Sequence, residues 1–212
     1  MVLYFYVELQ DKTKIPDDCI NFDCDDCNLE ELPELPNSLI VLTCSYNNLT
    51  KLSELPNELY NLECDNNNLT ELPKLPDSLE NLRCNNNIIS ELPDLPNSLI
   101  ELQCDNNYLT VIPKLPDSLK ILTCSFNSLY SLPELPNSLS TLMCCNNKLS
   151  ELAELPISLK ILWCNNNNIK YLSSNNCKII KELSLYYIKV LNNPFSANFT
   201  NNENFKEYLM NL

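Results

Sequence analysis

Cysteine is the residue type in this sequence with the most evident chemical potential. Twelve of the 212 residues are cysteines, and eight of them recur at a constant spacing of 20 residues. Thiols stacked at one position of a repeating structure could bind a soft metal or form disulfides. A metal site, however, needs ligands that converge on one point, whereas a ladder of thiols extends in one dimension. The spacing therefore favours small, buried and reduced side chains with raised pKa values and low reactivity. The series comprises Cys24, Cys44, Cys64, Cys84, Cys104, Cys124, Cys144 and Cys164.

Cys145 lies outside this series, one position after Cys144. A catalytic thiol needs a base to activate it, and the chain contains no histidine. We therefore expect no catalytic residue and no metal or other cofactor. A hydrolase that uses Cys145 or surface carboxylates is the alternative from a different functional class.

Carboxylates form the second candidate set, and they gather in the N-terminal half of the chain. A pair of acids could act as in a glycosidase, and a larger group could bind calcium. They are spread over alternate repeats without an enclosing pocket, which favours a solvated acidic surface. Arg83 lies between Glu63 and Glu101 in the pattern and balances part of this charge. The carboxylates are Asp23, Asp25, Glu63, Asp65, Glu101 and Asp105.

Composition excludes several functional classes. The chain has no glycine, so the phosphate-binding loops of nucleotide enzymes and the nucleophile elbow of hydrolases are absent. A net charge of −14 argues against nucleic acid and anionic membrane surfaces as partners. The first ten residues do not resemble a signal peptide, and no apolar run is long enough to span a membrane. With reduced cysteines, these features predict a cytoplasmic protein.

The elements that position these residues follow from the 20-residue repeat. In the segment 41–45, Leu42 and Cys44 alternate with polar or exposed positions, which is the pattern of a half-buried strand. One unit cannot close its own core, so stacked units are expected to bury continuous columns of leucine and cysteine. An asparagine recurs three positions after each cysteine from Asn47 to Asn167, and we expect it to turn inward and bond the backbone. The prolines of each Leu-Pro-x-Leu-Pro link favour extended backbone over helix.

The ends of the chain depart from the repeat. Residues 1–14 alternate and predict an N-terminal capping strand, and residues 15–170 form eight 20-residue repeats. Residues 171–195 read as one irregular last repeat, with a strand-like stretch at 183–188. Residues 196–212 combine a capping-box pattern with helical spacing and predict a C-terminal capping helix. We expect one domain, residues 1–212, and a monomer.

The repeat resembles the leucine-rich repeat, with cysteine in its third apolar position. Its 20-residue length and its Leu-Pro-x-Leu-Pro link are similar to the LPX-type repeats of bacterial effectors. The asparagine-rich, cysteine-bearing form also resembles leucine-rich-repeat proteins of giant DNA viruses, which would place it in the host cytoplasm. The resemblance covers about residues 15–195. It implies a right-handed horseshoe of the α/β-solenoid class, mostly β, with a parallel sheet on the concave side and an extended, polyproline-II-like convex side.

Strand positions that point outward from such a sheet form the candidate binding face. In its C-terminal half these positions carry large apolar side chains, which are typical of interfaces. The competing interpretation is that the C-terminal cap covers Trp163. We expect the concave face to bind a partner protein that has a basic surface, and an adaptor with several binding surfaces is a further alternative. The candidate protein-binding residues are Glu63, Asp65, Arg83, Glu101, Asp105, Ile121, Phe126, Met143, Ile161 and Trp163.

Overall fold

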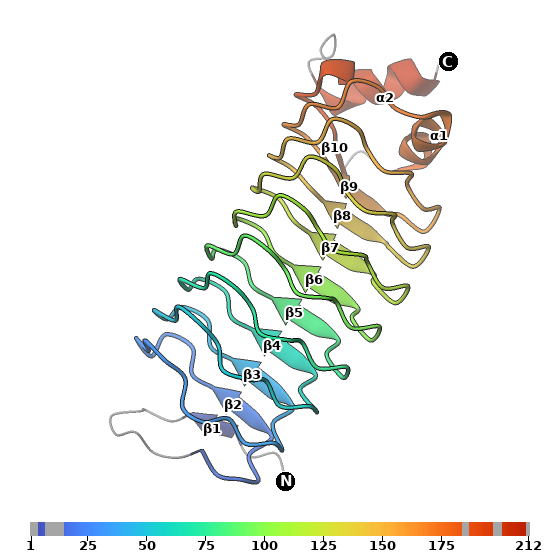
Figure 1. Cartoon of the computed structure of the whole chain (residues 1–212). Coiled ribbons are helices and arrows are strands. Elements are labelled where there is room, and N and C mark those ends of the chain that lie inside the picture. Colours follow the sequence, from blue (N-terminus) through green and yellow to red (C-terminus); the bar gives the residue numbers. More distant parts are fainter. Residues whose placement is uncertain (1–3, 7–14, 184–186, 197–200, 211–212) are drawn as a thin grey trace.

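The computed structural model describes residues 4–6, 15–183, 187–196 and 201–210. The described residues form an elongated solenoid whose coils stack along one axis, with the strands aligned on one side and two helices at the C-terminal end (Figure 1). The ten strands of the described residues belong to one sheet, and their order in the sheet is their order in the chain. This is the parallel, mostly β solenoid that the repeat predicts.

Each 20-residue repeat contributes one three-residue strand. Its central residue is Phe22 in the first repeat and a leucine in the other seven. Neighbouring strands pair in parallel with matching positions opposite each other, so Leu42 lies opposite Leu62 and Leu62 opposite Leu82. The strands are β1 (Tyr4–Tyr6), β2 (Asn21–Asp23), β3 (Val41–Thr43), β4 (Asn61–Glu63), β5 (Asn81–Arg83), β6 (Glu101–Gln103), β7 (Ile121–Thr123), β8 (Thr141–Met143), β9 (Ile161–Trp163) and β10 (Ile188–Lys189).

The core is a stack of similar layers. In the layer of β5, Leu82, Cys84, Ile89 and Leu79 are all fully buried. The prediction of a buried cysteine column is confirmed, since all eight members are at most 1% exposed. Each thiol therefore fills a small apolar slot between successive coils.

The asparagine column satisfies the backbone where the chain leaves each strand. The side-chain amide of Asn87 donates to the carbonyls of Cys64 (3.0 Å) and Cys84 (3.2 Å), and its Oδ1 accepts from the amide of Leu69 at 3.0 Å. The same contacts recur in the other repeats, which confirms the predicted bonding. Asn127 differs from the prediction in being half-buried, although it keeps its backbone contacts.

The links between β2 and β9 contain only turns and bends, so the prediction that these segments lack helix is confirmed. Their serines explain the last position of the link motif. Ser78 Oγ donates to the carbonyls of Asn57 at 2.8 Å and Leu59 at 2.7 Å in the preceding coil. Neighbouring links are thereby joined without any helix.

The last repeat, which the sequence analysis describes as irregular over 171–195, contains a helix that was not predicted. The helix α1 spans Ser174–Glu182 and begins where the side chain of Ser173 accepts a hydrogen bond from the Asn176 amide at 3.1 Å. The link prolines are missing from this segment, so nothing prevents helical backbone. Asn176 is fully buried and ties the helix to the preceding link through the amide of Leu155 at 2.8 Å.

The terminal cap is a second short helix, α2 (Asn202–Met210), which begins later than the predicted 196–212. Asn201 Oδ1 accepts from the amide of Asn204 at 2.8 Å and so marks the start of the helix. Asn202 bonds the carbonyl of Ile188 at 2.9 Å, and the Phe205 ring packs 5.4 Å from the Phe195 ring. These contacts place α2 against β10 at the open end of the sheet. Of the predicted cap strand and irregular rung, residues 1–3, 7–14 and 184–186 lie outside the described residues.

Candidate functional site

The outward side of the sheet is formed by three rows of side chains, which we call the sheet face. The first row precedes the central leucine of each strand, the second follows it, and the third follows the cysteine. In the layer of β6 these positions are Glu101, Gln103 and Asp105, all half-buried. The sequence-predicted binding residues fall in these rows, with the exception of Phe126, which occupies the adjoining turn.

The cysteine column lies behind the sheet face, and its thiols are buried. Cys64 Sγ donates to the carbonyl of Arg83 at 3.3 Å, and Cys104 Sγ donates to the carbonyl of Thr123 at 3.3 Å. Burial, the largest cause, raises the pKa of Cys84 above its usual value of 9.0, with the nearby Asp65 and Asp105 adding to the effect. These thiols are therefore structural side chains rather than nucleophiles.

The third row forms a ladder that the sequence analysis missed. From Asp25 to Ser125, each side chain accepts a hydrogen bond from the backbone amide of the equivalent residue in the next repeat. Asp65 Oδ1 accepts from the amide of Asn85 at 2.5 Å, Asn85 Oδ1 from Asp105 at 2.7 Å, and Asp105 Oδ1 from Ser125 at 2.5 Å. The recurrence of a side-chain acceptor at this position, as Asp, Asn or Ser, was the signal available in the sequence.

This ladder changes the role of two predicted binding acids. Asp65 and Asp105 each devote one carboxylate oxygen to the backbone, so both are structural as well as acidic. Burial, the largest cause, raises the pKa of Asp65 and of Asp105, although the backbone hydrogen bonds that each accepts oppose the shift. The charge on these two acids is therefore held in a partly desolvated position.

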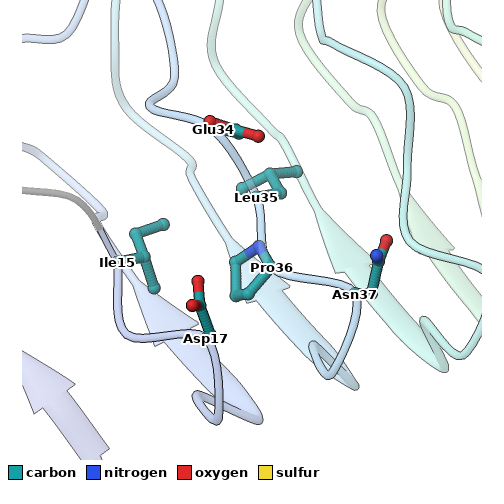
Figure 2. Close-up of a pocket in the computed structure, with 6 residues that line it drawn as sticks. All are labelled: Ile15, Asp17, Glu34, Leu35, Pro36 and Asn37. Carbon is teal, nitrogen blue, oxygen red and sulfur yellow. The ribbon is translucent and has the colours of Figure 1, made fainter.

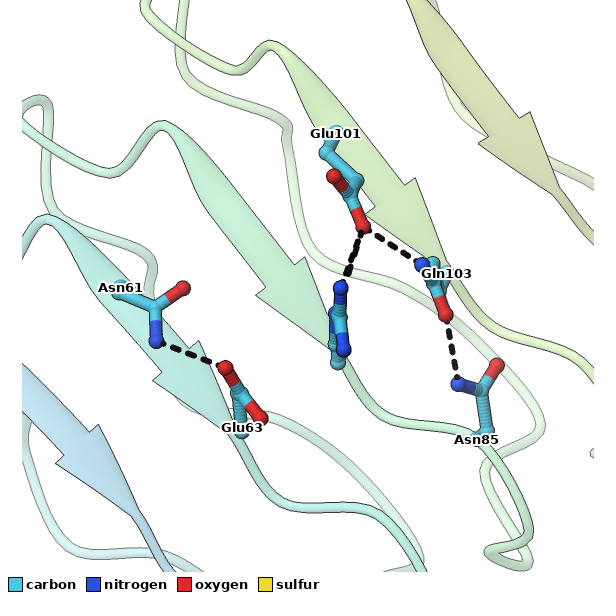
Figure 3. A network of polar contacts seen from close by, with 6 residues as sticks. Asn61, Glu63, Asn85, Glu101 and Gln103 are labelled. Atoms are coloured by element: carbon cyan, nitrogen blue, oxygen red, sulfur yellow. Dashed lines mark hydrogen bonds and ion pairs between the residues drawn. The ribbon is translucent and has the colours of Figure 1, made fainter. Parts of the chain in front are cut away.

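Glu63 and Glu101 make polar contacts with neighbouring side chains on β4, β5 and β6. Figure 3 shows Asn61 beside Glu63, and Glu101 bonded to Gln103, which in turn meets Asn85. Arg83 Nη2 lies 3.2 Å from Glu101 Oε1, so the predicted charge balance is a formed ion pair with Glu101. Glu63 bonds the amide of Asn61 at 3.1 Å rather than pairing with Arg83 within salt-bridge distance.

The C-terminal half of the sheet face contains a depression with a volume of about 650 Å³. Four predicted binding residues line it: Asp105, Phe126, Met143 and Trp163. Its polar rim adds the third-row and turn residues of neighbouring repeats, such as Asn146 and Asn165. We call this feature the C-terminal depression. Ile121 and Ile161 are half-buried on the same face but are not among its lining residues.

Trp163 is half-buried and contributes to this depression, so the C-terminal cap does not bury it. The Nζ atom of Lys189 in β10 lies 3.5 Å from the centre of the indole ring. Lys189 pairs with Trp163 in the register of β9 and β10. The sequence analysis missed this lysine because it lies outside the repeat.

Phe126 adopts a backbone conformation that is unfavourable for an aromatic residue. Its φ angle is +56°, in the left-handed region, and its side chain is 58% exposed. Most other repeats place asparagine at this turn, which tolerates the conformation better. Tyr46 is the other aromatic exception, with φ of +58° and 62% exposure. An exposed aromatic residue in this strained turn stabilises the fold no better than asparagine would. Its presence therefore favours a role at the surface.

Cys145 also lines the C-terminal depression, although it is only 6% exposed. Its Sγ donates to Asn165 Oδ1 at 2.9 Å, and burial, the largest cause, raises the pKa of its thiol. Burial, the raised pKa and the hydrogen bond to Asn165 all favour the thiol over the thiolate, so the geometry of Cys145 supports packing.

A smaller pocket of about 190 Å³ lies near the N-terminal end, between the first two links (Figure 2). Its lining includes Asp17 and Glu34 beside Leu35 and Pro36. Among the described residues, no group of three or more metal-ligating side chains is present, and no helix is long and apolar enough to cross a membrane.

The comparisons with known proteins point to one architecture. No family model matches the sequence, and no curated protein sequence matches it. Among solved structures, YopM from Yersinia enterocolitica is 39% identical with a TM-score of 0.75, over 76% of this chain and 36% of that chain. The LRR domain of a Shigella effector is 35% identical with a TM-score of 0.61, over 73% of this chain and 70% of that domain.

A third structure bears on the cysteine column. The functional domain of InlJ from Listeria monocytogenes, which includes a cysteine ladder, is 26% identical with a TM-score of 0.56, over 72% of this chain and 41% of that one. The similarity to YopM corresponds to only about a third of the YopM chain, whereas the Shigella domain is matched over most of its length.

Proposed function

Because the chain belongs to the leucine-rich-repeat family and is similar to the LRR domains of bacterial effectors, we propose that it binds a partner protein through its sheet face. The similarity to effectors extends the proposal to a host protein as the partner. Binding uses the two halves of the face differently, since one half is acidic and the other is apolar.

The C-terminal depression is the observation that carries this proposal. It brings Phe126, Met143 and Trp163 to one hollow of the sheet face. Aromatic side chains and methionine are enriched at protein interfaces, and a few such anchors usually account for most of the binding energy. The strained turn of Phe126 supports the same interpretation, because stability is sacrificed for an exposed ring.

The acidic half is proposed to guide the partner rather than to hold it. Its charges are spread over several layers, and Glu101 is already paired with Arg83. Exposed and half-exposed charges act over about 10 Å at moderate ionic strength, which accelerates encounter with a basic surface. Glu63→Gln is expected to slow association and reduce its salt dependence, with little effect on dissociation.

The experiment that tests the proposal combines capture with sheet-face variants. The protein is immobilised, exposed to host-cell lysate, and each captured protein is purified and its dissociation rate measured by surface plasmon resonance. Trp163→Ala should weaken binding by about 2 kcal/mol or more, through faster dissociation, if Trp163 is an anchor. Tyr171→Ala is the matched control, because Tyr171 is a 65% exposed aromatic residue that does not line the depression. A partner that tolerates Trp163→Ala and Phe126→Ala would refute the proposed face.

A second candidate function, an adaptor, is favoured by one observation. Exposed apolar side chains occur in the segments that follow the asparagine turns of two successive repeats, where Tyr108 is 64%, Val111 60% and Tyr130 58% exposed. Lys148 lies 5.5 Å from the centre of the Tyr130 ring. A captured partner that is lost on Tyr108→Ala but retained on Trp163→Ala would support this second surface.

A further inference from the structure

The contact between Lys189 and Trp163 is unusual for a surface lysine. Lys189 is exposed, yet its ammonium lies 3.5 Å from the centre of the indole ring. Within the described residues the structure pairs Lys189 with no carboxylate. The ring face of Trp163 is therefore a site that already binds a cation in this chain.

The charge of the whole sheet face favours a basic partner, and one of its carboxylates, Asp105, lines the C-terminal depression. The described sheet face carries six carboxylates and two cations, Arg83 and Lys189, which gives a net charge of −4. Arg83 is engaged with Glu101, so Lys189 is the only cation of the described face outside an ion pair. A basic segment along the face is attracted by the carboxylates in the layers of β2 to β6 and meets one competing ammonium at the C-terminal depression. The carboxylates are Asp23, Asp25, Glu63, Asp65, Glu101 and Asp105.

We infer that Lys189 occupies the place of a partner's cationic side chain. A lysine or arginine from a basic segment displaces Lys189 from the Trp163 ring, and its aliphatic stem lies along Met143 and Phe126. Lys189 belongs to a two-residue strand at the end of the sheet and is exposed, so its side chain can withdraw into solvent. This inference rests on the proposed function and names the chemistry that the same face recognises.

The exchange makes Lys189 a selectivity element. Because one cation replaces another on the ring, the cation–π contact contributes little net affinity by itself. A cationic side chain gains only when the rest of its segment also contacts the acidic half, so isolated cations bind poorly. Removal of the Lys189 side chain abolishes this competition. The affinity of the chain for a basic segment should then rise about two- to five-fold, the value of a cation–π contact at a partly exposed site.

Trp163 allows a direct test because it is the only tryptophan of the chain. Its emission reports on this depression without labelling the protein. Affinity is measured from the fluorescence anisotropy of a fluorescein-labelled hexaarginine peptide. Unlabelled hexaarginine is used when the Trp163 emission is recorded. Lys189→Ala is compared with Lys160→Ala, which changes the net charge equally at an exposed lysine that does not line the depression. Hexaglutamate peptide is the control of opposite charge.

The expected result is that Lys189→Ala binds hexaarginine about two- to five-fold more tightly than Lys160→Ala does. Trp163 emission should change on binding in both variants, and hexaglutamate should bind neither. Equal affinities in the two variants, binding without a change in emission, weaker binding by Lys189→Ala, or no binding of hexaarginine overturns the inference. The capture experiment tests the proposed function separately. That function fails if the captured partners tolerate Trp163→Ala and Phe126→Ala, whatever the result with hexaarginine.

Discussion

The turn at Phe126 predicts a substitution that stabilises the fold and weakens binding. Phe126 has a φ angle of +56° and is 58% exposed, so it loses little packing when it is replaced. Left-handed backbone costs a bulky residue about 1 kcal/mol more than asparagine. Phe126→Asn should therefore raise the free energy of unfolding by about 1 kcal/mol, or the melting temperature by about 2–4 °C for a chain of this size.

A neighbouring interaction adds to this gain. Asn106 Nδ2 donates to Asn86 Oδ1 at 2.7 Å, and Asn166 Nδ2 donates to Asn146 Oδ1 at 2.9 Å, at the same turn position in other repeats. An asparagine at 126 would lie between Asn106 and Asn146 and join these two pairs. Such a hydrogen bond near the surface contributes at most about 0.5–1 kcal/mol.

The assay measures stability and binding on the same variants. Thermal and urea unfolding give the stability of each variant. The dissociation rate of the captured partner shows how much binding is lost when the Phe126 ring is removed. Tyr46→Asn is the matched control, because Tyr46 has φ of +58° and 62% exposure but does not line the C-terminal depression. Tyr46→Asn should stabilise the fold to a similar extent and leave binding unchanged.

Two results would refute this reasoning. If Phe126→Asn leaves stability unchanged or lowers it while Tyr46→Asn raises it, the ring of Phe126 contributes packing that its exposure does not indicate. If Phe126→Asn stabilises the fold and the partner still dissociates at the native rate, Phe126 is not an anchor.

Three other predictions concern the asparagine column, the third row of the sheet face and the cysteine column. Asn87→Ala leaves buried backbone groups without partners and should cost about 1–3 kcal/mol in urea unfolding, whereas Asn68→Ala, at an exposed position, should change stability by less than about 0.5 kcal/mol. Burial raises the pKa of Asp105 above 3.8, so the charged form lowers the stability of the fold as pH rises. Asp105→Asn should therefore be more stable than the native chain at neutral pH and equally stable well below pH 3.8. A stability difference between the two proteins that stays constant with pH would contradict the raised pKa. Titration with Ellman's reagent should find few accessible thiols in the native protein and all twelve after denaturation, and rapid reaction of most thiols in the native state would exclude a buried ladder.

Periodicity made the regular part of the fold predictable. Leu82, Cys84 and Asn87 each represent a position that recurs through the repeats, so the strand, the core slot and the inward-turned amide could be assigned together. Stacking then follows because one 20-residue unit cannot bury its own apolar side chains. The absence of link prolines after residue 170 indicated that the repeat ends, although it did not show that a helix replaces it.

The contacts of the sheet face were less accessible from sequence. The recurrence of Asp65, Asn85 and Asp105 at one position indicated surface side chains, and only the structure showed their oxygens bonded to the next backbone amide. Side-chain direction at a sheet edge depends on which backbone donors remain free there. The sequence pattern specifies the position of a residue in the coil, but not the partner that its polar atoms select.

The sequence alone determined the repeat, the single parallel sheet and the division of its face into acidic and apolar halves, because these properties depend on spacing and residue type. The tertiary structure decided what happens where the spacing ends. Trp163 and Lys189 are brought together only by the pairing of β9 with β10, after an intervening helix that breaks the period. Their contact depends on how the last segment packs against the stack, and packing outside a repeat follows no template that the sequence displays.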